Sequence, residues 1–219
     1  MPAAKEPSSA VLSPVERISE VLFGLIMVLS FTGTLSVATA QRNDVREMMI
    51  AAIGCNLAWA IVDAVMYMMD NVLDRGGKLR ALHAVRRAPT PEDARSTIAA
   101  SLPPLIAGMV DSEELEELRQ GLLRLPEPPA WPAPTLTDLR GAAGVFLLVL
   151  LSTFPVVLPF AFIQEAQLAL HVSNAVAIAL LFAGGLTLGG FAGMRPLLTG
   201  LAMVAIGLAL VGVTIVLGG

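Results

Sequence analysis

The sequence is poor in cysteine and in charge, and each shortage excludes a class of protein. A single cysteine, Cys55, permits neither an internal disulfide framework nor a thiolate metal cluster in this chain of 219 residues. Charged residues make up 15% of it, against about a quarter in a soluble domain. The net charge of −4 argues against nucleic acid as the partner, because neutralising phosphates requires a basic face. The sequence has no nucleophile elbow, phosphate loop, zinc helix motif or haem-attachment pattern, so we expect no enzyme and no tightly bound cofactor.

Apolar residues are what the chain has in excess. They account for 55% of the sequence, and the mean hydropathy is +0.74. The excess is clustered in nearly uncharged runs of about the length that crosses a bilayer. We therefore predict an all-α, polytopic membrane protein with five transmembrane helices, in contact with the lipid bilayer. The predicted spans are 21–40, 48–69, 139–163, 168–192 and 196–217.

A polar insert separates the second span from the third. Most of the lysines and arginines lie in it, and helix starts are predicted at Pro91 and Ser112, where acids occupy the first turn. Its first part, 72–88, is expected to continue the helix of the second span. The predicted organisation is a polar leader at 1–15, transmembrane helices at 16–70, an insert at 71–137 with a proline-rich linker at 126–134, and transmembrane helices at 138–219.

The distribution of positive charge predicts the orientation. The arginine-rich insert and the N-terminus share one side of the membrane, which the positive-inside rule assigns to the cytoplasm, and the C-terminus then lies outside. The alternative for the first span is that it is a signal peptide and is cleaved off, because residues 38–40 resemble a cleavage site. The leader is acid-rich rather than basic and the apolar run is long, which favours a retained span.

Polar residues recur at steps of three and four along the second span, which places them on one helix face. An acid inside the bilayer costs about 2.5 to 3.5 kcal/mol on insertion scales and is by default a functional candidate. Asp63 is such an acid, and the antiparallel first span is expected to bring Glu20 to the depth of Met66 and Asp70. Carboxylates with a thioether suit a divalent first-row cation, and a carboxylate in low dielectric also holds a proton. The predicted membrane site comprises Glu20, Asn56, Asp63, Met66 and Asp70.

A second candidate site is an acidic cluster in the insert. It consists of Glu113, Glu114, Glu116 and Glu117. These form two overlapping E-x-x-E pairs, and on a helix both members of a pair can bind one cation. Possible co-ligands are His83, Met109 and Asp111.

Structural roles are the alternative for all these acids. Glu20 then caps the first span near the headgroups, Asp63 bonds a neighbouring helix, and the cluster is a solvated helix face.

The last three spans have the features of a scaffold. Pro155 and Pro159 predict a kink in the third span whose freed carbonyls need other partners. Gly185, Gly189 and Gly193, spaced by four residues, predict close helix packing in the fourth.

The order of these features resembles the vacuolar iron transporter family, including its bacterial members. Residues 154–160 (FPVVLPF) resemble the double-proline third span of that family, and 170–174 (LHVSN) and the glycine-rich last span at 196–219 are similar to it. Residues 19–25 (SEVLFGL) resemble the acid-led opening of its first span. The chain departs from the family in lacking the Asp-Gly pair usual at that acid, and in having a short insert with one glutamate cluster.

The resemblance implies a homodimer in a bacterial inner membrane that exports Fe²⁺, Mn²⁺ or similar ions from the cytosol in exchange for protons. It assigns the family's first-span acid to Glu20, and its second-span acid and methionine to Asp63 and Met66 with a shifted spacing. It also implies that the glutamate cluster collects metal. The alternative is a membrane scaffold or metal sensor that does not transport and uses the insert for protein contacts.

Overall fold

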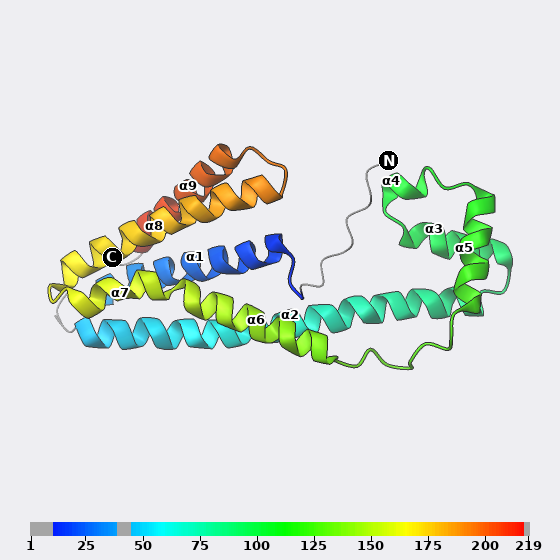
Figure 1. Cartoon of the computed structure of the whole chain (residues 1–219), viewed down its shortest axis with the longest axis horizontal. Coiled ribbons are helices and arrows are strands. Elements are labelled where there is room, and N and C mark those ends of the chain that lie inside the picture. The colour runs from blue at the N-terminus through cyan, green and yellow to red at the C-terminus, as the bar shows by residue number, and fades with distance from the viewer. Residues whose placement is uncertain (1–10, 39–44, 217–219) are drawn as a thin grey trace. The chain divides into compact units, whose positions relative to one another are not determined.

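The chain forms helices throughout the part described by a computed structural model (Figure 1). The structure describes residues 11–38 and 45–216, and the side chains of these except at 31–38, 45, 47–48 and 214–215. The all-α prediction is confirmed within these residues. The helices are α1 (Pro14–Ala38), α2 (Val45–Arg87), α3 (Pro91–Ser101), α4 (Pro104–Ala107), α5 (Ser112–Arg124), α6 (Leu136–Ser152), α7 (Phe154–Phe162), α8 (Ala166–Phe191) and α9 (Pro196–Val216).

Four helical stretches of the described residues are long and apolar enough to cross a membrane. They are Met49–Arg87, Leu136–Phe162, Ala166–Phe191 and Pro196–Val213. The expected first span overlaps α1, and its last residues, together with the possible cleavage site, lie outside the described part of the chain. Association with a bilayer is thus supported by four helices, and the count of five remains a prediction.

The chain divides into two compact units. The first contains residues 1–67 and 136–219, and the second contains residues 68–135. The helix α2 runs without interruption from one into the other, in line with the prediction that the second span continues beyond its apolar run.

In the first unit, α1 is the helix around which the others pack. It contacts α6, α8 and α9, while α7 and α9 also pack on α8. Leu22, Leu25 and Leu29, at helical spacing, are buried against Ala177 and Leu181 of α8. Because lipid tails are as apolar as leucine, these contacts stabilise the unit through close packing rather than through exclusion of water.

Glycines allow α8 and α9, which run side by side in opposite directions in Figure 1, to approach each other closely. A Cβ on Gly185 would lie 2.8 Å from the Cα of Gly200, and one on Gly189 would lie 2.7 Å from the Cα of Pro196. Gly193 has a different role, because its φ of 68° forms the turn that leads into α9. The predicted glycine packing is confirmed for the first two positions and is wrong for the third.

The second unit has a small core of its own. Val85 of α2, Ala94 and Ile98 of α3, and Leu115 and Leu122 of α5 pack together. The predicted helix starts are confirmed: Thr90 caps α3, and Asp111 forms a capping box with Glu114 at the start of α5. The one-turn helix α4 is not predicted from the sequence.

Arginine side chains of α2 hold the segments that follow α5. The guanidinium of Arg86 donates hydrogen bonds to the carbonyls of Leu122, Leu125 and Pro126, which the end of α5 leaves without helical partners. The guanidinium of Arg75 donates to the carbonyl of Ala133 in the proline-rich linker.

Candidate functional site

The first unit brings Glu20 of α1 close enough to Asp63 of α2 for their charges to interact. The rings of Phe23 and Trp59 meet edge to face one turn away, with 6.2 Å between their centroids. Since the two helices are antiparallel, this contact sets Glu20 opposite Asp63. The sequence predicted a register nearer to Met66 and Asp70, because it contains no information on which side chains of the two helices touch.

One carboxylate oxygen of this pair has no partner. Asp63 Oδ2 is buried and accepts no hydrogen bond from any described group. A buried acceptor without a partner is costly, and such groups in proteins usually meet a ligand, an ion or water. Glu20 is half-buried beside it. Glu20 on α1 feels the charge of Asp63 on α2, and a cation or a proton bound at either carboxylate would relieve their repulsion.

Two other predicted members of the membrane site lie further along α2. Met66, in the first unit, is 49% exposed, and it lies one turn beyond Asp63 on the same helix. Asp70 is exposed and belongs to the second unit. Within the first unit, Glu20 is thus in electrostatic range of Asp63, and Met66 is adjacent to Asp63 on the helix.

Asn56, the remaining member of the predicted membrane site, makes hydrogen bonds to the backbone and side chain of another part of the first unit. It is fully buried, and its amide donates hydrogen bonds to the carbonyls of Val149 and Leu150 and to Thr153 Oγ1. These groups lie where α6 ends and α7 begins. Its Oδ1 has no hydrogen-bond partner among the described residues.

The predicted third span is interrupted between α6 and α7, next to the two prolines. Pro155 stands in the first turn of α7 and Pro159 inside it, and neither has an N–H to donate. Ser152 Oγ and Thr153 Oγ1 donate to the carbonyls of Val149 and Leu150, together with Asn56. The carbonyls of Val149 and Leu150, in the last turn of α6, thus have side-chain donors where the helix ends.

The glutamate cluster of α5 is partly committed to contacts within the protein. Glu114 completes the capping box of Asp111. Glu116 accepts two hydrogen bonds from Arg119, at 2.8 and 2.7 Å, and lies 3.6 Å from Arg95. Hydrogen bonds from Arg119 lower the pKa of Glu116 to about 2. Each E-x-x-E pair therefore has one engaged member, which leaves Glu113 and Glu117 exposed.

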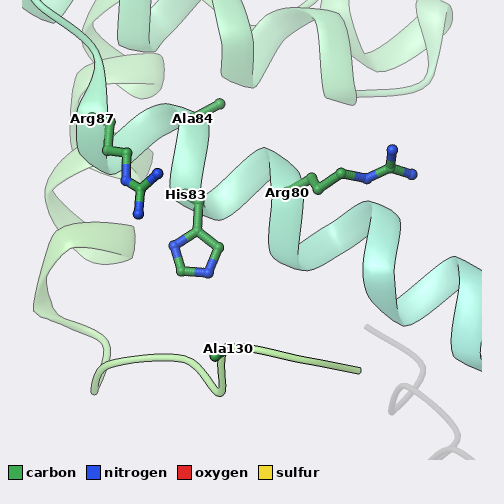
Figure 2. A pocket seen from close by; sticks show the side chains of 5 residues that line it. All are labelled: Arg80, His83, Ala84, Arg87 and Ala130. Carbon is green, nitrogen blue, oxygen red and sulfur yellow. The ribbon is translucent and has the colours of Figure 1, made fainter. Parts of the chain in front are cut away.

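No group of three or more His, Cys, Asp or Glu side chains in the described part of the chain is arranged to hold a metal ion. Of the possible co-ligands of the cluster, Asp111 meets it through the capping box with Glu114. Met109 and Asp111 are exposed, and His83 lines a cavity with two arginines (Figure 2).

Comparison with protein-family models and with curated proteins found no match. The resemblance to the vacuolar iron transporter family therefore depends on the short segments quoted above, and the site geometry has to support a function by itself.

Proposed function

We propose that the protein transports divalent metal ions, with Fe²⁺ and Mn²⁺ as the expected substrates, out of the cytosol in exchange for protons. The observation that supports this is the approach of Glu20 and Asp63 from two helices, with a buried oxygen of Asp63 left without a partner. Intramembrane acids that face each other or a cavity mark ion and proton pathways in membrane proteins.

The chemistry of the pair suits an exchange of metal for protons. Carboxylate oxygens bind Mn²⁺ and Fe²⁺, and the thioether of Met66, one turn away, favours the softer of the two ions. When the metal leaves, the carboxylates repel each other unless one binds a proton. Metal and proton thus compete for the same oxygens, and this competition couples their movements.

The proposal includes the expected topology and assembly. It places five spans in a bacterial inner membrane, with α1 as the first span, the N-terminus and the insert in the cytoplasm and the C-terminus outside. It also includes a homodimer, as implied by the resemblance. Exposed apolar side chains along α2, among them Ile53, Leu57 and Ile61, are available to lipid or to a second copy.

The test is metal flux into proteoliposomes, measured with a Mn²⁺-sensitive dye at opposite pH gradients. The wild-type chain should move Mn²⁺ against the flow of protons, and the double variant Glu20→Gln, Asp63→Asn should fall to the background of empty liposomes. Glu165→Gln is the matched control, because Glu165 is an exposed acid between α7 and α8 whose side chain makes no capping hydrogen bond. Flux retained by the double variant would contradict the assignment of the site.

A second candidate is a membrane scaffold or metal sensor that does not transport. The engagement of Glu114 and Glu116 in a helix cap and in ion pairs, within a unit that has its own core, favours a structural use of the insert. Failure of Fe²⁺, Mn²⁺, Co²⁺ and Zn²⁺ to bind to the purified protein or to cross the liposome membrane would favour this candidate.

A further inference from the structure

Two cavities adjoin each other in the second unit, between α2 and the proline-rich linker. One, of about 460 Å³, is lined by Arg80, His83, Ala84, Arg87 and Ala130 (Figure 2). The other, of about 400 Å³, shares Arg80, His83 and Ala130 with the first. We call the two together the linker groove.

The linker wall of the groove is held by specific contacts. The hydrogen bond from Arg75 to the carbonyl of Ala133 fixes the linker to α2 at one end. Next to it, a Cβ on Gly76 would lie 3.3 Å from Pro132 Cγ, so the absence of a side chain at Gly76 lets the linker lie close to the helix. Five prolines in 126–134 stiffen this wall further.

The basic side chains of the groove lack acidic partners. Within the described part of the chain, Arg80, His83 and Arg87 have no hydrogen bond or ion pair. Other basic side chains of this unit are engaged, for example Lys78 with Asp74. In Figure 2, His83 and Arg87 point toward the linker, while the guanidinium of Arg80 extends along the helix.

A bound anion would stabilise this arrangement of donors. Residues 80, 83 and 87 are spaced by three and four, so they share one helix face, which carries the guanidinium groups of two arginines. The helix dipole favours a cation only in the last turn of α2, which accounts for Arg87 and leaves Arg80 and His83 unexplained.

The second cavity adds an apolar surface. Val72, Leu73, Leu79 and Pro132 line it, and Trp131, with 80% of its surface exposed, lies at its edge. A ligand of the groove would therefore meet the side chains of Arg80, His83 and Arg87 together with aliphatic and aromatic side chains.

We propose that the linker groove binds a phosphate-bearing ligand, with Arg80, His83 and Arg87 on the phosphate and the Trp131 cavity on an attached apolar part. Guanidinium groups recognise phosphate through paired N–H donors. The phosphate can belong to an anionic lipid headgroup or to a soluble organic phosphate, because both present the same oxygens.

The test uses the full-length protein in phosphatidylcholine nanodiscs with Trp59→Phe, so that Trp131 is the remaining tryptophan. Inorganic phosphate is titrated by calorimetry, and Trp131 emission is recorded with and without phosphatidylglycerol in the nanodisc. We expect saturable phosphate binding or an emission change that requires phosphatidylglycerol; the first indicates a soluble ligand and the second a lipid. In either case, Arg80→Gln with Arg87→Gln should weaken binding about tenfold or more.

Two further variants separate recognition from general charge. Arg124→Gln removes a comparably exposed arginine from the last turn of α5, and it should leave binding unchanged. Arg80→Lys with Arg87→Lys keeps the charge without the paired donors, and it should restore part of the affinity while showing that the unit is folded. The proposal is overturned if neither probe binds, or if Arg124→Gln weakens binding as much as the double variant.

Discussion

Asn56 shows how a single polar side chain stabilises a helix break inside the apolar unit. Its amide donates to two carbonyls and a hydroxyl at the junction of α6 and α7. Because α6 ends at Ser152, the carbonyls of its last turn lack backbone donors, and a side chain from another helix supplies one. The sequence predicts Asn56 as a site residue because it shares a helix face with Asp63. In the structure Asn56 bonds to the junction of α6 and α7, whereas Asp63 is in electrostatic range of Glu20.

We predict that Asn56→Ala destabilises the chain by about 1 to 3 kcal/mol, because buried carbonyls lose a donor. Thermal unfolding in detergent measures this. Leu57→Ala, which truncates an exposed neighbour on α2, should change the unfolding temperature much less. Since Thr153 shares the network, Thr153→Ala and Asn56→Ala should cost less together than the sum of the two. Fully additive effects would contradict the network.

Glu20 and Asp63 are the residues on which the proposed function depends. Their identity as candidates followed from the cost of placing acids in or near the bilayer. Their pairing could not be predicted in this way, because the register between α1 and α2 depends on contacts such as that of Phe23 with Trp59. The buried Oδ2 of Asp63 is likewise a property of the packed helices.

At the scale of elements, the contact of α8 with α9 depends on glycine. We predict that Gly185→Ala destabilises the chain by about 1 to 3 kcal/mol, because the new methyl group meets the backbone of α9. Gly190→Ala is the control on the same helix. Nothing lies within 4 Å of a Cβ there, so the substitution should be neutral or stabilise by about 0.5 to 1 kcal/mol. Equal unfolding temperatures for the two variants would refute the packing.

The ion pair of Glu116 in α5 predicts how the stability of the folded chain depends on pH. Its Glu116 is bonded to Arg119 and Gln120, which lowers the pKa of the carboxyl to about 2 from a usual 4.5. A lowered pKa means that the interaction stabilises the folded chain fully above pH 4.5 and is lost as the pH falls toward 2. Carboxyl-carbon NMR of the full chain should show Glu116 titrating near 2, and Arg119→Gln should raise that pKa toward 4.5. An unchanged pKa in Arg119→Gln would show that the ion pair is not formed in solution.

The elements were predictable where local chemistry decides them. Thr90 with Pro91, and Asp111 with Glu114, fix helix starts through caps that a sequence displays directly. Long apolar runs in the sequence likewise predict three helical stretches, namely α6 together with α7, then α8, and then α9. The short α4 and the linker groove were not predictable, because they depend on contacts such as that of Gly76 with Pro132, between residues far apart in the sequence.

At the scale of the whole molecule, the composition separates two kinds of unit. The first unit is built of apolar helices whose side chains pack or face outward, and four stretches of the described helices can cross a membrane. The second unit has a small core, paired charges and a basic groove. The proposed transport site lies in the first unit and the proposed phosphate site in the second, so the failure of one proposal leaves the other standing.

The central claim is that a metal ion binds between α1 and α2, and its most direct test is an anomalous difference map of the purified protein with Mn²⁺. The account predicts a peak between the carboxylates of Glu20 and Asp63, in contact with Asp63 Oδ2, that is absent from Asp63→Asn. A map without that peak, or with a peak only at Glu113 and Glu117 of α5, would contradict it.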